Sequence, residues 1–255
     1  MKTRIPAMLA GLVVGGALLL SSVGVAAAVT PPAGPAGKGV CATEAAAMKT
    51  GATVATARAF GDCEINRRFT SLDALAGRIT ASKVLTSSDA GALQSEVGAT
   101  KTGLTSLKAT IDAETDLTAL KADIAKIATD YRVYLLVTPQ VNLVSAADGV
   151  VAAQARFADV NTKLAARIAA DKTAGKDTTA AQTALDAMNA AVANAVGLAG
   201  PLPAKLLPLT PAQYNGGTAG PIITSARTAL GQARDQIKAA IADAKTCRDD
   251  LKALK

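Results

Sequence analysis

Apolar residues recur at alternating intervals of three and four positions from about residue 63 to the C-terminal end of the chain. This interval places them on one face of an α-helix, and such a face is stable when it packs against a similar face on another helix. No comparable stretch alternates with the period of two that is typical of a strand. The pattern therefore predicts an all-α fold. The longest stripe contains Ile223, Leu230, Ile237, Cys247 and Leu251.

The stripes and the breaks between them predict a series of helices along the chain. These helices span residues 63–84, 87–113, 116–137, 140–172, 178–199 and 218–254. Almost no residues separate the third helix from the fourth, so Pro139 either kinks one long helix or divides two. The segment 200–217 is rich in proline and glycine, and we expect it to be the main loop.

The length of the last predicted helix indicates an extended molecule. At 1.5 Å per residue, residues 218–254 would reach about 55 Å, which is more than a compact domain of this size needs. We expect an elongated antiparallel helical bundle over residues 63–255, from which residues 140–200 project as a long coiled-coil hairpin.

Residues at several predicted helix ends fit capping patterns. Thr86 with Asp89, and Thr179 with Gln182, have the spacing at which a hydroxyl and a longer polar side chain satisfy each other's backbone N–H groups. Gly175 stands where the chain leaves one helix, a position that often needs a positive φ.

The N-terminal end has the pattern of a secretory signal peptide over residues 1–28. Lys2 and Arg4 precede a long apolar run, and small residues at 26–28 offer a cleavage site. Cleavage would give a secreted, extracellular or cell-wall-associated protein, whereas an uncleaved segment would be a membrane anchor. Residues 29–62 are expected to form a disordered spacer followed by a weak helix.

Three cysteines, Cys41, Cys63 and Cys247, lie in a chain for which export, and hence disulfide formation, is predicted. The pair Cys63–Cys247 is favoured, because the two ends of an antiparallel bundle can meet. One unbroken helix between Cys41 and Cys63 would hold them about 33 Å apart. Gly51 and Gly61 weaken such a helix, so the pair Cys41–Cys63 stays open, as does Cys41–Cys247.

The composition argues against catalysis. The chain has no histidine, which removes the commonest proton shuttle and the commonest metal ligand near neutral pH. It also has no pair of cysteines at the spacing of a structural zinc site. We therefore expect a protein that is not an enzyme and that needs no cofactor or metal.

Two clusters resemble sites but have simpler interpretations. Asp112, Glu114 and Asp116 are spaced like the first ligands of a calcium loop, but Leu117 stands where the turn needs glycine, so they are expected to serve a helix N-terminus. The second cluster is Tyr131, Arg132 and Tyr134, in which a charged residue stands between two aromatic rings. We expect the tyrosines to be core residues whose hydroxyls lie at the solvent-exposed edge of the helix interface.

The last predicted helix carries a row of basic side chains, which we call the basic ridge. We expect the ridge to pair with acids of neighbouring helices or to face water, or alternatively to contact a polyanion. The acidic residues Asp235, Asp243, Asp249 and Asp250 are expected on the other flank of the helix. The ridge consists of Arg227, Arg234, Lys238, Lys245, Arg248 and Lys252. Without Lys2 and Arg4, the formal charge of the chain falls from +7 to +5.

Residues 129–148, with the sequence TDYRVYLLVTPQVNLVSAAD, resemble a motif in a group of exported helical proteins found mainly in actinobacteria. Segments 104–112 and 206–215 support the resemblance, which covers about residues 63–255. Asn142 stands where relatives of this type often have histidine. The resemblance implies an exported α-helical protein, and it brings no catalytic residues because no activity is established for the group.

These observations favour a secreted or cell-envelope protein that serves as a structural spacer or protein-interaction surface. One alternative is a module that binds an anionic envelope polymer through the basic ridge, and a second is a carrier of a small apolar ligand. The expected partner is an unknown protein or an anionic polymer, and the helices could also self-associate. Nucleic acid is not expected, because no aromatic residues interleave with the cations. A membrane is expected only if the signal segment is uncleaved.

Overall fold

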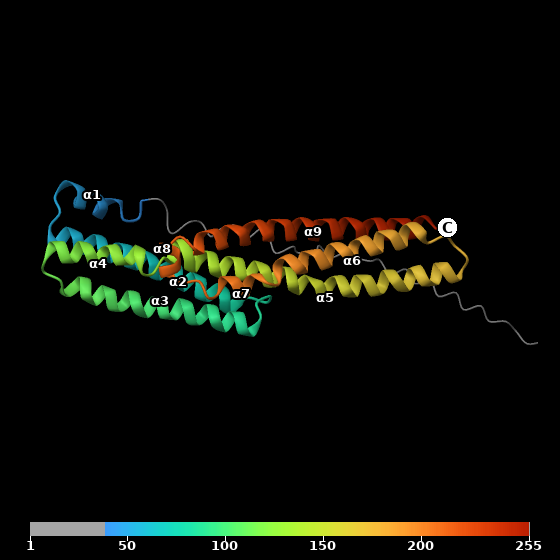
Figure 1. Ribbon diagram of the computed structural model, residues 1–255, viewed down its shortest axis with the longest axis horizontal. Helices are drawn as coiled ribbons and strands as arrows, with labels where there is room; N and C mark the ends of the chain where they lie inside the picture. The colour runs from blue at the N-terminus through green and yellow to red at the C-terminus, as the bar shows by residue number, and fades with distance from the viewer. Residues whose placement is uncertain (1–38, 255) are drawn as a thin grey trace, which may run out of the picture.

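The computed structural model describes residues 39–254, and this part of the chain is helical without any strand (Figure 1). The all-α prediction is confirmed. The expected signal peptide and residues 29–38 of the expected spacer lie outside the described residues. The elements are α1 (Ala42–Thr50), α2 (Val54–Ala81), α3 (Ser87–Ala113), α4 (Leu117–Thr129), the π-helical turn η1 (Val133–Val137), α5 (Thr138–Thr173), α6 (Thr179–Ala199), α7 (Leu202–Leu206), α8 (Pro211–Asn215) and α9 (Ala219–Ala253).

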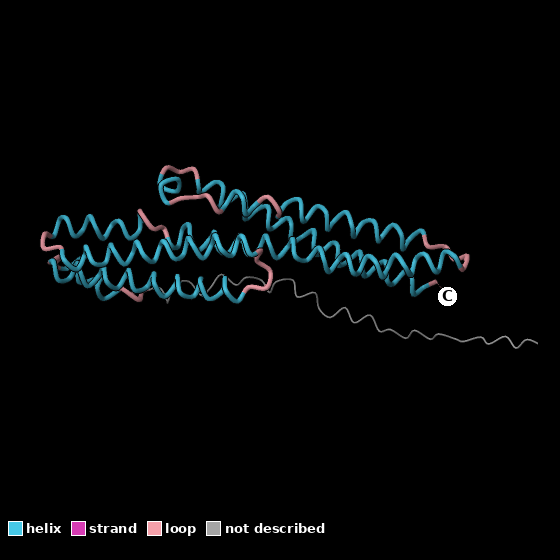
Figure 2. The backbone as a smooth tube through the Cα atoms, turned by 90° about the horizontal axis from the view of Figure 1, so that it is seen from below, coloured by secondary structure: helices cyan, strands magenta, loops and turns pink. Residues whose placement is uncertain are grey.

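The long helices form two bundles that lie end to end (Figures 1 and 2). In the first bundle α2, α3 and α4 pack together, and α1 lies against α2. In the second bundle α5, α6 and α9 pack together. Helices α7 and α8 lie near the middle, beside the start of α9. The elongated antiparallel shape expected from the sequence is therefore present.

The two bundles are filled by different kinds of side chain. The core of the first is made of leucine and isoleucine, such as Ile65, Leu72 and Leu104, all of which are fully buried. The second buries many alanines where α6 meets α9, including Ala195 and Ala233. Small side chains let two helix backbones approach closely, so dispersion contacts between the backbones replace the burial of large side chains.

The expected hairpin of residues 140–200 is formed by α5 and α6, but it does not project alone. Helix α9 packs along both of its arms, so that the second half of the molecule is a three-helix bundle. We expected the last helix to belong to the N-terminal bundle instead. Its stripe of small residues fits the alanine-rich face of α6, which explains where it docks.

The first strong helix begins at Val54 rather than at residue 63. Its start is fixed by a capping box in which Thr53 and Thr56 satisfy each other's backbone N–H groups. Gly61 does not break this helix, because it is buried against α4, where an added Cβ would lie 3.1 Å from Ile124 Cγ1. The expected weak helix is α1, which buries none of its residues.

The chain breaks between α4 and α5 at Arg132 rather than at Pro139. Arg132 has a φ of 42°, which is in the left-handed region. From Val133 the chain runs through η1 directly into α5, and the Thr138 N–H bonds to the Val133 carbonyl with the five-residue spacing of a π-helix. Pro139 fits in the first turn of α5, where its missing N–H and fixed φ are tolerated.

Most of the other predicted boundaries hold, with differences in capping. Thr86 caps α3 by accepting the Asp89 N–H at 3.1 Å, but the Thr86 N–H binds Asp148 and not Asp89, so the expected reciprocal pair is only half formed. Gly175 has the expected positive φ of 79°. Thr179 does not cap α6 together with Gln182. Instead the Asp177 carboxylate accepts the Thr179 N–H at 3.0 Å. The expected loop 200–217 contains the short helices α7 and α8.

The segment Leu117–Thr173 contains a window that is long and apolar enough to cross a membrane by length and composition. Within the protein, 61% of that window is buried. A buried core helix meets the same criterion, and the contacts of α5 with α6 and α9 account for its apolar face.

Candidate functional site

Cys41 and Cys63 form a disulfide, with their Cα atoms 5.8 Å apart. The bond joins the start of α1 to the middle of α2. The residues between the two cysteines do not form one helix, because α1 ends at Thr50 and the chain turns back before Val54. The 33 Å separation expected for an unbroken helix therefore does not arise.

The favoured pairing Cys63–Cys247 is wrong. Cys247 lies near the end of α9 in the second bundle, whereas Cys63 lies in the first bundle. Cys247 is a free thiol with 0% exposure, at a seam position of its helix. Burial raises the pKa of this thiol, so it is held as an unreactive apolar residue.

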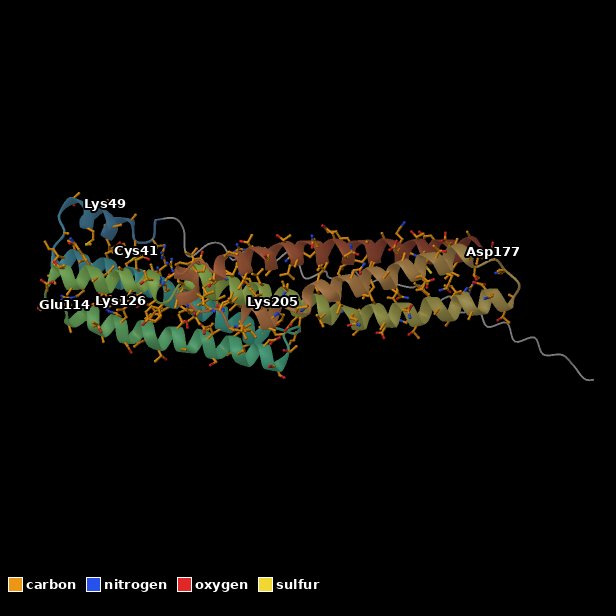
Figure 3. All side chains as sticks on the ribbon, in the orientation of Figure 1. Cys41, Lys49, Glu114, Lys126, Asp177 and Lys205 are labelled. Carbon is orange, nitrogen blue, oxygen red and sulfur yellow. A yellow bond between two sulfur atoms is a disulfide. The ribbon has the colours of Figure 1, made fainter. Side chains whose placement is uncertain are left out.

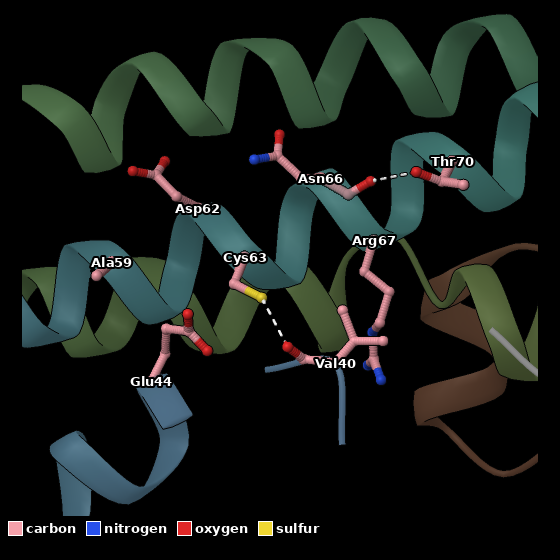
Figure 4. Close-up of a pocket in the computed structure, with 8 residues that line it drawn as sticks. All are labelled: Val40, Glu44, Ala59, Asp62, Cys63, Asn66, Arg67 and Thr70. Atoms are coloured by element: carbon pink, nitrogen blue, oxygen red, sulfur yellow. Dashed lines mark hydrogen bonds between the residues drawn. The ribbon is translucent and has the colours of Figure 1, made fainter. Parts of the chain in front are cut away.

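A shallow groove of about 430 Å³ runs beside the disulfide, between the start of α1 and the outer face of α2 (Figure 4). The Cys63 Sγ lies 3.8 Å from the Val40 carbonyl oxygen, and this is a contact rather than a hydrogen bond because a disulfide sulfur carries no proton. Arg67 Nε and Glu44 Oε2 are buried without a hydrogen-bond partner among the described residues. The groove is lined by Val40, Glu44, Ala59, Asp62, Cys63, Asn66, Arg67 and Thr70.

Two arginines of α2 surround Tyr134 of η1. The guanidinium carbons of Arg67 and Arg68 lie 5.0 and 5.2 Å from the centre of the ring. One oxygen of Glu64 binds both, at 2.7 and 2.5 Å. Arg68 is only 7% exposed, so this cation depends on the carboxylate and on the ring for compensation. The tyrosine hydroxyl lies 3.4 Å from Ser71 Oγ. The cluster holds η1 against the first bundle.

The other side of the same turn binds α8. Arg132 Nε donates to the Asn215 side-chain oxygen at 2.7 Å, and the Asn215 amide donates to the Thr129 carbonyl at 2.9 Å. The Arg132 guanidinium also lies 5.2 Å from the centre of the Tyr214 ring. We call this region, where η1, α7 and α8 meet between the bundles, the waist.

Gln140 completes the waist from the first turn of α5. Its side chain is 1% exposed, and its amide donates to the carbonyls of Leu206 and Leu209 at 2.9 and 3.0 Å. On the opposite side Tyr131 packs so closely on Gly103 that an added Cβ would lie 2.5 Å from the ring. The waist thus binds α3, α5, α7 and α8 to one turn.

Two of the three segments that carry the resemblance meet at the waist. Residues 129–140 contribute Tyr131, Arg132, Tyr134 and Gln140. Residues 206–215 accept the hydrogen bonds of Arg132 and Gln140. The third segment, 104–112, follows the glycine on which Tyr131 packs. Packing between distant elements therefore accounts for the side chains of the motif. Asn142 is half-buried and takes no part in these contacts.

The acidic cluster before α4 fits the expectation only in part, because Glu114 and Asp116 serve the N-terminus of α4 whereas Asp112 lies in the last turn of α3. Asp112 pairs with Lys108 at 3.0 Å, and Glu114 accepts the backbone N–H groups of the next two residues at 2.7 Å. Asp116 caps α4 through the Ala119 N–H at 2.7 Å. Over residues 39–254 no group of three potential ligand side chains is placed to hold a metal.

The basic ridge lies along α9, but its charges are partly compensated within the helix. Lys238 pairs with Asp235 at 2.9 Å. Asp249 binds both Lys245 and Arg248, at 3.2 and 3.1 Å, and these hydrogen bonds lower the pKa of its carboxyl group. Asp235 and Asp249 were expected on the opposite flank of the helix, but they contact the ridge itself. Arg227, Arg234 and Lys252 are exposed and have no acidic partner among the described residues.

Asp148 was not among the predicted site residues, but it connects the two bundles. Its carboxylate accepts the Thr86 N–H at 2.9 Å, at the start of α3, and the residue is 5% exposed. Burial raises the pKa of this carboxyl group, and the hydrogen bond from Thr86 opposes that shift. A signal was present, because Asp148 interrupts the apolar stripe of Val144, Ala147 and Val150.

Figure 3 shows Cys41 and Lys49 at the α1 end of the molecule, Lys205 at the middle and Asp177 at the opposite tip. The disulfide groove lies between α1 and α2 in the first bundle, whereas the basic ridge lies on α9 in the second, so they are separate surfaces. Comparison of the chain with protein-family models, with curated proteins and with solved structures gives no match.

Proposed function

We propose that this chain is a non-enzymatic spacer or protein-interaction protein that acts outside the cytoplasm. The observation that carries the proposal is the end-to-end arrangement of two bundles, joined by α5 through a tightly packed waist. At 1.5 Å per residue, α5 alone is about 54 Å long and α4 about 20 Å. A chain folded in this way separates whatever binds its two ends.

An extracellular location has two lines of support. The Cys41–Cys63 disulfide is of the kind that persists in oxidising compartments. The N-terminal signal pattern and the resemblance to exported helical proteins point to the same location. Expression with the native N-terminus should yield exported protein beginning near Val29. Protein that stays inside the cell with its N-terminus intact would contradict this part of the proposal.

The spacer function requires the two ends to stay apart in solution. Energy transfer between dyes at Glu114→Cys and Asp177→Cys tests this in the Cys247→Ala background, with the native disulfide oxidised. We expect low transfer efficiency for this pair. The control pair, Glu114→Cys with Lys205→Cys, joins the end to the middle and should give clearly higher transfer. High transfer for the first pair would show that the molecule folds back on itself and would overturn the spacer.

Binding of an anionic polymer is a second candidate, favoured by the uncompensated cations of the ridge. Residues 138–254 carry 12 basic and 9 acidic side chains, whereas residues 39–137 carry 11 of each. The excess charge therefore lies in the bundle that contains the ridge. A polyphosphate chain bound through it should dissociate steeply as salt competes.

Matched substitutions separate ridge binding from a general effect of charge. The ridge variant replaces Arg227, Arg234 and Lys252 with glutamine. The control replaces three exposed cations of α5 in the same way: Arg156, Lys163 and Lys172. We expect the ridge variant to lose most polyphosphate affinity at low salt and the control to keep it. Equal losses in the two variants would remove the ridge as a site.

A further inference from the structure

Helix α1 is attached to the molecule by weak contacts and one covalent bond. None of its residues is buried, and Met48 reaches the core only partly. Within the described chain, no hydrogen bond joins a side chain of α1 to α2. The three residues between α1 and α2 include Gly51, which adds no side-chain contact. The Cys41–Cys63 disulfide is therefore the main tie that holds α1 in place.

The two cysteines of the disulfide differ in how easily a reagent can reach them. Cys41 is 5% exposed, whereas Cys63 is half-buried and lines the groove of about 430 Å³. A groove of this size is large enough for a small thiol. Arg67 lines the same groove, but it is paired with Glu64, and the carboxylates of Glu44 and Asp62 also line the groove, so access depends on the space beside Cys63 and not on charge. An attacking sulfur can thus reach Cys63 more readily than Cys41.

We propose that the Cys41–Cys63 disulfide is a redox-controlled latch for α1, which a small thiol opens while both bundles stay folded. The thiolate attacks Cys63 Sγ and forms a mixed disulfide, and the broken bond leaves its electron pair on Cys41 Sγ, which takes up a proton. A second thiol molecule then attacks the mixed disulfide. It frees Cys63 as a thiol and leaves as the oxidised dimer of the reagent. Two thiols are oxidised and one protein disulfide is reduced.

Opening the latch changes where the chain is attached to the bundles. With the disulfide closed, the backbone at Cys41 is fixed to the middle of α2. With it open, the first fixed residue is Val54, and residues 41–53 could extend to about 43 Å. The position of residues 41–53 relative to α2 would then depend on the redox state. This inference does not depend on the proposed spacer function, because it concerns only the attachment of α1.

Limited proteolysis of the full chain tests the latch. Lys49 is exposed within α1, and trypsin cuts such a site quickly only when the local helix opens. Treatment with reduced glutathione should speed cleavage after Lys49 at least tenfold, while the far-ultraviolet circular dichroism falls only slightly. Unchanged cleavage after complete reduction would overturn the proposal, and so would loss of most helical signal.

Two variants separate the latch from the third cysteine. Cys247→Ala should respond to glutathione like the native chain. The double variant Cys41→Ser with Cys63→Ser should be cut rapidly after Lys49 without any thiol. If the double variant does not fold, reduction of the native chain still decides the matter. Slow cleavage of a folded double variant would show that other contacts hold α1.

The site of attack is tested by trapping. Brief exposure to limiting glutathione, followed by iodoacetamide, should leave glutathione on Cys63 and the alkyl group on Cys41. Peptide mass spectrometry identifies both. Glutathione found mainly on Cys41 would contradict the role of the groove in admitting the thiol.

Discussion

Individual side chains of the waist join elements that are distant in the sequence. The chain has three tyrosines and no tryptophan, and Tyr131, Tyr134 and Tyr214 all belong to this region. Their near-ultraviolet circular dichroism therefore reports packing at the waist, while the far-ultraviolet signal reports the helices. Circular dichroism can therefore separate the effect of a substitution on packing at the waist from its effect on total helix content.

Replacing Gln140 with alanine should loosen the waist. The change leaves the Leu209 carbonyl without its donor and the Leu206 carbonyl with only the Leu209 N–H, and we expect a loss of about 1–3 kcal/mol in the free energy of unfolding. The near-ultraviolet signal should fall while helical content stays near native. Gln182→Ala removes an exposed glutamine and should cost less than about 0.5 kcal/mol. Equal effects of the two variants in urea unfolding would contradict the role of Gln140.

Two glycines of α3 should respond differently to alanine. Gly98 faces open space, so Gly98→Ala should stabilise the protein by about 0.5–1 kcal/mol through helix propensity. At Gly103 the added methyl meets Tyr131, so Gly103→Ala should displace the ring and cancel that gain. Thermal unfolding and the tyrosine signal measure both effects. A stabilised Gly103→Ala protein with a native tyrosine signal would show that the ring is not tightly placed.

Asp148 should make stability depend on pH. Its raised pKa in the folded protein means that the folded state binds the proton more tightly than the unfolded state does. The resulting stabilisation is complete below the ordinary pKa of aspartate, and it is lost as pH rises through the raised value. Asp148→Asn retains an acceptor for the Thr86 N–H and removes the buried charge. This variant should be more stable than the native chain at pH 7, and between pH 3 and 7 its stability should lack the pH dependence that Asp148 causes. A variant less stable than the native chain at pH 7 would contradict the role of the buried Asp148 carboxyl group.

Pairs of helices in the two bundles depend on different packing. In the second bundle α6 and α9 approach through buried alanines, and only a small side chain fits such a contact. In the first bundle larger side chains keep the helices further apart, with Gly61 as a local exception.

The close contact of α6 with α9 is tested by enlarging one alanine. Ala195 is 0% exposed, and Ala195→Leu should cost about 1–3 kcal/mol because the added atoms have no room. Ala190 is exposed on the same helix, and Ala190→Leu should change stability by less than about 0.5 kcal/mol. Urea unfolding followed by circular dichroism gives both values. A neutral Ala195→Leu would mean that the interface is loose.

The two bundles make few direct contacts with each other, and this limits how far a local disturbance in one bundle affects the other. Direct contacts between α2 or α3 and α5 are few compared with those inside each bundle. The waist and Asp148 supply most of the connection. Each bundle is therefore expected to unfold partly by itself.

Hydrogen exchange can measure this independence. Ala195→Leu should lower amide protection throughout α5, α6 and α9, and should leave α2, α3 and α4 close to native values. The reason is that Ala195 lies in α6, which packs against α5 and α9 of the second bundle. Equal loss of protection in both bundles would show that the molecule unfolds as a single unit.

The positions of the helices followed from the amino-acid pattern, because a stripe of apolar residues and a cap are local features. The predicted helix 87–113 coincides with α3, and 178–199 differs from α6 by one residue. The predictions were wrong where one residue type is compatible with two local structures. Gly61 typically weakens a helix, but here it allows close packing against Ile124. Pro139 fits in the first turn of α5, and the chain breaks earlier, at Arg132.

The partners of the helices could not be derived in the same way. Many alanine-rich faces are compatible with one another, and contacts over long chain separations decide among them. Helix α9 packs on α6, which puts Cys247 in the second bundle and leaves Cys63 to Cys41. The waist is a further example, because Arg132, Tyr134 and Gln140 bind residues tens of positions away. Local periodicity placed the elements along the chain, while complementary packing between distant faces chose the disulfide, the waist and the two bundles.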